Sequence, residues 1–134
     1  IIISSVKTKK ELPFLMTIGK STGLYKYFPV NWIDNVESLA KFVFGPSIKK
    51  KIGLYRKYLS VRDEHYLRWC IDKIINWDNE KVSKNLIHIH GSLDLVFPSV
   101  YISNVILVKN ATHAMILTKA SWLNKNIPEL ILKN

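Results

Sequence analysis

The sequence predicts an α/β protein in which parallel strands are joined by helical segments. The run 85–90 is apolar at Leu86, Ile87 and Ile89 and stops at Gly91, where the backbone can turn without a Cβ penalty. The run 105–108 is continuously aliphatic, which is typical of a strand buried on both faces of a parallel sheet. About a dozen residues separate the two runs, roughly the minimum for a parallel crossover.

Length and composition indicate a single folded domain. The chain has 134 residues, 48% of them hydrophobic, which is enough for a core and too apolar for a disordered tail. No apolar run approaches the roughly 20 residues of a membrane span, so no membrane partner is expected. The single cysteine, Cys70, excludes an internal disulfide and fits a reducing compartment, which predicts a cytoplasmic location.

The net charge of +10 has two interpretations. The lysines at 49–51, with Arg56 and Lys57, are either a phosphate-binding stripe or a solvated helix face. Tyr55 and Tyr58 recur at helical spacing beside leucines, which favours packing over base stacking. We therefore expect no nucleic-acid partner; steep salt dependence of DNA retention would indicate the opposite.

The segment 1–23 is expected to form a core strand and its exit. Residues 1–6 predict a strand, 7–10 a polar exit and 12–18 a short helix. Because the chain begins inside a predicted strand of a parallel sheet, it is expected to be part of a larger protein. Gly19 to Gly23 match Gly-x-Ser-x-Gly, but a nucleophilic serine needs this motif between a buried strand and a helix. The preceding run predicts a weak helix, so Ser21 is not expected to be a nucleophile.

The segment 24–84 predicts an inserted helical cap. Asn31 or Asp34 can begin a first helix, which Gly45 and Pro46 end. A basic helix follows over 47–59. Ser60 is expected to begin a third helix, with Asp63 completing its cap. That helix has an apolar stripe at 66, 67, 70, 71, 74 and 77, where Cys70 is a small core residue.

The segment 85–134 carries the candidate site. Asp94 falls just past one strand and His113 just past the next, at the sheet edge where open α/β folds bind ligands. An acid and an imidazole there can act as orienting carboxylate and general base. A helix is expected over 114–123, and a final turn over 126–132 with Pro128 near its start.

His88 and His90 raise an alternative. They point to the same face of a strand, and with Asp94 and His113 they offer a nitrogen-and-oxygen set that zinc accepts. The simpler interpretation is that His88 fills space under a helix and His90 supports the turn before Asp94. A lone His-x-His is a weak metal signal, so no metal or other cofactor is expected.

The runs 90–98 (HGSLDLVFP) and 110–115 (NATHAM) resemble the C-terminal part of α/β-hydrolase-fold enzymes. The resemblance implies an acid, Asp94, after the seventh strand and a histidine, His113, after the eighth, with residues 1–5 similar to the sixth strand and its exit. The family's nucleophile follows the fifth strand, so nucleophile and oxyanion hole would precede this chain. Relatives often have glycines before the histidine, where Asn110 and Ala111 stand here.

The resemblance implies the C-terminal part of an α/β-hydrolase parallel sheet, with about three strands and an inserted helical lid. The implied activity is serine-type hydrolysis of an ester or thioester with a small-molecule acyl substrate. Asp94 and His113 would be two members of a Ser-Asp-His triad, and the chain alone would be inactive. The lid aromatics would form either the acyl pocket or the lid core: Tyr25, Tyr27, Phe28, Trp32, Phe42 and Phe44. A non-catalytic interaction protein on the same fold is the alternative. It would be favoured if the preceding strand-to-helix turn, where the family carries its nucleophile, lacked Ser, Cys or Asp.

Overall fold

The computed structural model describes residues 1–28, 44 and 63–133. Its strands are β1 (Ile2–Ile3), β2 (His88–Gly91) and β3 (Ile106–Val108), and its helices are α1 (Phe14–Thr22), α4 (Glu64–Ile75), α5 (Met115–Thr118) and α6 (Ala120–Leu132). Short 3-10 turns lie at Lys9–Glu11, Leu24–Tyr27 and Ser99–Tyr101. The predicted first helix of the cap, its basic helix over 47–59, Trp32 and Phe42 fall outside the described residues.

The three strands form one parallel sheet in the order β1-β2-β3. Ile2 pairs with His88, and Ile89 pairs with Ile106 in the next ladder. This confirms the α/β class and the parallel pairing expected from the apolar runs. Each of the three strands is shorter than its apolar run predicted, because the flanking residues turn away into loops.

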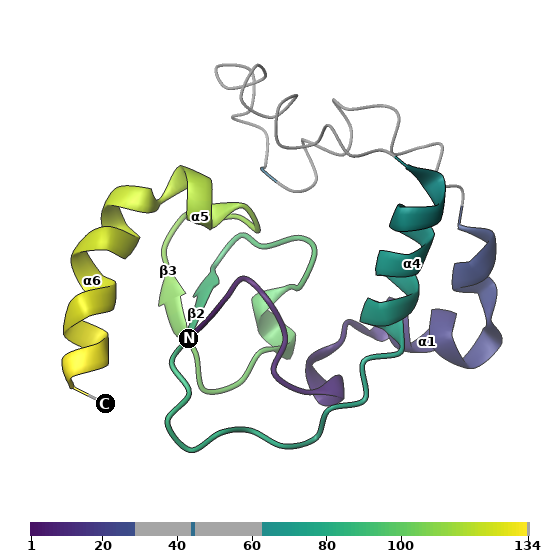
Figure 1. Ribbon diagram of the computed structural model, residues 1–134, viewed down its shortest axis with the longest axis horizontal. Helices are drawn as coiled ribbons and strands as arrows, with labels where there is room; N and C mark the ends of the chain where they lie inside the picture. Colours follow the sequence, from purple (N-terminus) through teal and green to yellow (C-terminus); the bar gives the residue numbers. More distant parts are fainter. Residues whose placement is uncertain (29–43, 45–62, 134) are drawn as a thin grey trace.

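A core cluster fills the space between the sheet and α6 (Figure 1). Ile89 of β2 and Met115 of α5 are fully buried, and Leu123 of α6 is nearly so. Trp122, Ile127 and Leu130 of α6 pack against this cluster. In Figure 1, α1 and α4 lie on the opposite side of the sheet from α6. Within the described ranges, no helix combines the length and apolarity needed to cross a bilayer.

The helices correct three expectations. The single helix predicted over 114–123 is two helices, with a break at Lys119. Pro128 lies inside α6 and not at the start of a separate turn, because apolar residues on both sides of it continue the face that packs on the core. Asp63 caps α4, since its carboxylate accepts from the Tyr66 backbone N–H at 2.7 Å, while Ser60, the expected first residue of this helix, lies outside the described residues. Along α4, Ile75 is the buried residue, and it lies off the expected stripe.

The first half of the polar exit after β1, Lys7 and Thr8, is buried, which the sequence did not indicate. Lys7 Nζ lies 2.8 Å from Glu11 Oε1 and 3.2 Å from His88 Nδ1, and it also donates to the Ser103 carbonyl. Glu11 accepts in addition from the backbone N–H groups of Lys7 and Ser103. Since each charge is paired and hydrogen-bonded, the network can stay buried. It joins the chain after β1 to β2 and to the loop before β3.

Two pKa shifts follow from this network. Burial lowers the pKa of His88, and the Lys7 charge lowers it further, so the imidazole is held neutral. His88 then donates from Nε2 to the Ser5 carbonyl at 2.9 Å and accepts from Lys7 at Nδ1. Burial alone would raise the pKa of Glu11, but hydrogen bonds from Lys7 and Ser103 outweigh burial and lower it.

The Glu11→Gln substitution is expected to lower the free energy of unfolding by about 3 kcal/mol, because it leaves the Lys7 charge buried without its partner. Urea denaturation at neutral pH measures this loss. Glu80→Gln is the matched control, since Glu80 pairs with Lys9 at the exposed surface, where solvent screens the pair and its loss should change the free energy of unfolding much less. Equal effects of the two substitutions would contradict the stabilising role given to the buried pair.

Candidate functional site

The loops that follow β2 and β3 bring Asp94 and His113 together. The Ser92 and Leu93 backbone N–H groups donate to the Val108 and Ala111 carbonyls at 3.1 and 2.8 Å. Through these bonds the two loops run against each other, and His113 Nδ1 lies 2.9 Å from Asp94 Oδ2. The two residues named from strand ends are therefore in direct contact, on the carboxyl side of adjacent parallel strands.

Gly91 allows this close approach of the loops. A Cβ built on Gly91 would lie 2.4 Å from the Ala111 carbonyl oxygen and 2.9 Å from that of Thr112. Both contacts are to backbone, which cannot move aside as the end of a side chain can. Gly91 does not have a positive φ, so its backbone conformation is open to other residues. Glycine is needed here because there is no room for a side chain between the loops.

We expect Gly91→Ala to destabilise the fold by about 2 kcal/mol, as overpacking does at tightly packed sites, and to separate Asp94 from His113. Thermal or urea denaturation measures the first effect. Gly19→Ala is the control: a Cβ on this α1 residue meets its nearest neighbour at an ordinary 3.6 Å, and alanine favours the helix. A Gly91→Ala protein as stable as Gly19→Ala would show that the loops can separate without cost.

Asn110 shows how the loop before His113 forms without the glycines that the hydrolase family often has there. Its φ is 55°, in the left-handed region that asparagine tolerates better than most residues. Its backbone N–H donates to the Ser92 Oγ at 3.0 Å. The departure noted in the sequence is thus compatible with a left-handed turn at this position.

The Asp94 carboxylate is buried, with 3% of the residue exposed, and both of its oxygens have partners. Oδ1 accepts from the backbone N–H groups of Val96 and Phe97, each at 2.9 Å. Oδ2 accepts from His113, and His90 Nε2 lies 3.3 Å from the same oxygen. Donors on both oxygens satisfy an ionised carboxylate, the form that can hold a protonated imidazole.

His113 is oriented by this carboxylate and remains accessible. Because Asp94 Oδ2 only accepts, His113 Nδ1 carries the proton and Nε2 is left as the basic nitrogen. The side chain is 26% exposed, and no residue in the described part of the chain hydrogen-bonds to Nε2. The Phe97 ring packs beside the imidazole, with ring centroids 5.6 Å apart. A histidine with one ring nitrogen held by a carboxylate and the other left free is the arrangement that general-base chemistry requires.

A pocket of about 390 Å³ opens beside His113. Its walls come from the chain after β1, the C-terminal end of α4 and the loops after β2 and β3: Ser4, Ser5, Val6, Lys73, Ile74, Trp77, Phe97 and His113. Ser4 is buried, and its backbone is in the left-handed region with φ of 50°. Its hydroxyl has no hydrogen-bond partner among the described residues. Neither the positive φ nor the burial of Ser4 was visible in the sequence.

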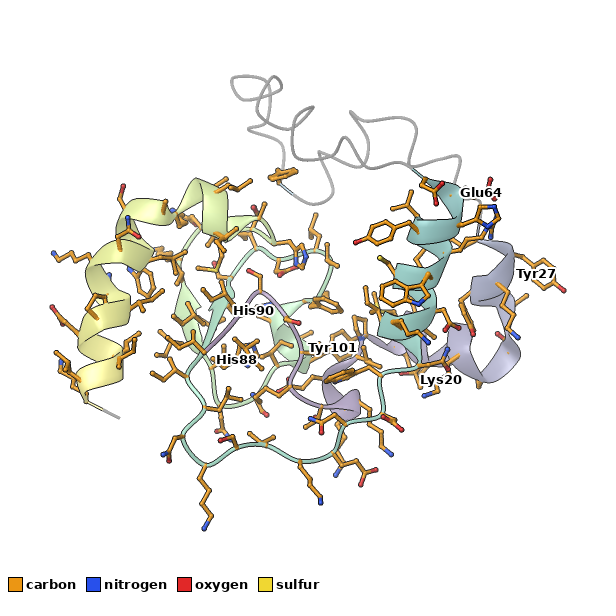
Figure 2. The ribbon with its side chains drawn as sticks, in the orientation of Figure 1. Lys20, Tyr27, Glu64, His88, His90 and Tyr101 are labelled. Atoms are coloured by element: carbon orange, nitrogen blue, oxygen red, sulfur yellow. The ribbon has the colours of Figure 1, made fainter. Side chains whose placement is uncertain are left out.

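Three of the described lid aromatics, Tyr25, Tyr27 and Phe28, lie away from this pocket. Tyr25 and Phe28 line a different pocket of about 310 Å³ against α4, together with Trp69. Tyr27 points outward on the far side of α1 (Figure 2) and is 83% exposed. Of the aromatics proposed as acyl-pocket walls, those described are therefore absent from the lining beside His113. Trp77 and Phe97 are the aromatic residues that line it.

Ser21 and His88 have roles apart from this site. Ser21 lies on the exposed surface of α1, where its Oγ donates to the Ile18 carbonyl at 3.0 Å. Figure 2 shows His88 and His90 together on β2, inside the half of the molecule that holds the sheet. His90 Nε2 lies 2.8 Å from the Phe97 carbonyl, so His90 contacts the turn that follows Asp94, whereas the sequence predicted that it supports the turn before Asp94. Across residues 1–28, 44 and 63–133, no three His, Cys, Asp or Glu side chains are arranged to hold a metal ion.

Comparison of the chain with protein-family models, curated proteins and solved structures finds no match to any of them.

Proposed function

We propose that this chain is the acid-and-histidine part of a hydrolase that cleaves an ester or thioester of a small-molecule acyl substrate. His113 takes the proton of a nucleophile and returns it to the leaving group, while Asp94 holds the histidine tautomer. The observation that supports this most is the 2.9 Å contact between His113 Nδ1 and the buried Asp94 Oδ2, at the carboxyl ends of neighbouring parallel strands.

The pocket supports a compact substrate with an apolar group. Val6, Ile74 and Trp77 provide apolar walls, and His113 contributes the polar group that meets the reacting atoms. A volume of about 390 Å³ is in the lower range of small-molecule sites. Short acyl or alkyl chains are therefore favoured over long ones.

The nucleophile of the proposed reaction comes from a segment outside residues 1–134. Among the described serines none hydrogen-bonds to His113, and the serine of the Gly-x-Ser-x-Gly motif lies on an exposed helix. The resemblance to α/β-hydrolases points the same way, since their nucleophile belongs to a strand that precedes those matched here. The chain alone is then expected to lack activity.

The test is hydrolysis of short p-nitrophenyl esters by two purified proteins. One is the 134-residue chain, and the other is the longer protein that includes the preceding segment of the gene. We expect hydrolysis by the longer protein and none by the chain. The proposal fails if the longer protein cleaves neither ester nor thioester substrates and has no Ser, Cys or Asp where an upstream strand meets its helix.

A further inference from the structure

His90 is a fully buried histidine of β2, and the polar contacts of its side chain all involve the turn that holds Asp94. Its Nε2 lies 2.8 Å from the Phe97 carbonyl oxygen and 3.3 Å from Asp94 Oδ2. The Phe97 backbone N–H in turn donates to Asp94 Oδ1. His90 thus contacts Phe97, the last residue of the 94–97 turn. It also lies beside the Asp94 carboxylate, which contacts His113.

These contacts determine where the His90 proton must be. The Phe97 carbonyl and the ionised carboxylate are both acceptors, so Nε2 has to be the protonated nitrogen. His90 Nδ1 is buried with no hydrogen-bond partner among the described residues. A proton there would be a buried donor without an acceptor, which is costly. His90 is therefore a neutral imidazole protonated at Nε2, the tautomer opposite to that of His113.

We propose that His90 is a positioning residue for the reaction. By anchoring the 94–97 turn through Phe97, it keeps Asp94 Oδ2 against His113 Nδ1 and so keeps Nε2 of His113 free for catalysis. This inference rests on the proposed function, because a fixed His113 tautomer matters only if His113 is the general base. It adds a third residue, from the same strand as Gly91, to the acid-and-histidine pair.

His88 offers a matched comparison two residues away on β2. It shares the face and the burial of His90, and the two rings meet edge to face with centroids 5.6 Å apart. Its hydrogen bonds go instead to Ser5 and Lys7, and neither of them involves the turn at Asp94. A substitution at His88 perturbs the same strand without touching the turn at Asp94.

Nitrogen-15 NMR of the imidazole rings in the full 134-residue chain tests the proposal, without substrate and at slightly alkaline pH. In the unmodified chain we expect His90 protonated at Nε2 and His113 protonated at Nδ1. In His90→Leu we expect the fraction of His113 protonated at Nε2 to rise several-fold. In His90→Gln, whose amide can donate to the Phe97 carbonyl, the original His113 tautomer should return, and in His88→Leu it should not change.

Three outcomes overturn the proposal. The first is a His90 proton on Nδ1 in the unmodified chain, a measurement that needs no variant. The second is an unchanged His113 tautomer in a folded His90→Leu chain, and the third is an equal change in His88→Leu. If the leucine variants do not fold, His90→Gln and the unmodified chain still decide the matter. Failure of the ester assay would leave these tautomers as they are, so the two proposals fail separately.

Discussion

Replacement of His113 by alanine is expected to lower kcat/KM for ester hydrolysis by on the order of 10⁶ in the longer protein. Loss of the general base leaves the nucleophile protonated, and in a well-studied serine protease removal of the histidine has an effect of this size. His113 lines the pocket and its Nε2 has no hydrogen-bond partner in the described residues, so no other described side chain is placed to take over its proton. Steady-state kinetics with p-nitrophenyl esters measures the change.

The control is His65→Ala, which removes an exposed imidazole from α4. It should leave kcat/KM within a factor of about two, because surface substitutions away from a site have small effects. His113→Ala should also fold, since the side chain is only partly buried. Full activity in a folded His113→Ala protein would remove His113 from the mechanism and with it the proposed reaction.

Local sequence patterns were sufficient to place Asp94 and His113. Asp94 follows a partly apolar run and Gly91 by three positions, and His113 follows the aliphatic run 105–108 by five positions, so each prediction depends on nearby backbone only. Once two such strands were taken as parallel neighbours, their carboxyl ends had to share one edge of the sheet. The 2.9 Å contact between the two side chains agrees with that inference.

Burial of the polar residues could not be read in the same way. Lys7 follows a strand and precedes two lysines, a pattern that suggests a solvated exit, yet it is 6% exposed. Its partners Glu11, His88 and Ser103 are 4, 81 and 96 positions away along the chain. Only the tertiary fold brings these groups together, so no local pattern could reveal the network.

The Gly-x-Ser-x-Gly match shows the opposite case, a local pattern without its structural context. Gly23 is left-handed, with φ of 71°, and ends α1 as a helix-terminating glycine. Gly19 lies within the same helix, where an added Cβ would meet Tyr25 at an ordinary 3.6 Å. The two glycines therefore do not shape a strained turn around Ser21, and the motif matches by composition alone.

The four residues of β2 link stability to the site. Ile89 packs in the core while Gly91 allows the loops to meet. His88 joins the buried network, and His90 supports the turn at Asp94. Side chains alternate along a strand, so the two histidines share one face of the sheet and Ile89 faces the core on the other. A substitution in β2 is thus expected to change folding and site geometry together, and each must be measured.

The Asp94→Asn substitution is expected to lower kcat/KM by on the order of 10⁴, the effect seen when a triad aspartate is replaced and the histidine takes the wrong tautomer. The hydrogen bonds around Asp94 explain why the tautomer should change here. The Val96 and Phe97 N–H groups both point at Oδ1, so the amide oxygen of the introduced asparagine must occupy that position. The NH₂ group of the asparagine then faces His113 Nδ1, which has to release its proton to accept the new hydrogen bond. The His113 proton moves to Nε2, where it blocks the basic nitrogen.

Kinetics and nitrogen-15 NMR of His113 should therefore change together, with a loss of kcat/KM and a shift of the proton from Nδ1 to Nε2. Asp78→Asn, at an exposed position after α4, should alter neither. The double variant with His113→Ala should be no slower than His113→Ala alone, because Asp94 acts through the histidine and residues that act as a unit are not additive. If Asp94→Asn slowed the reaction while His113 kept its proton on Nδ1, Asp94 would act by its charge and not by holding the tautomer. A further loss in the double variant would give Asp94 a role independent of His113.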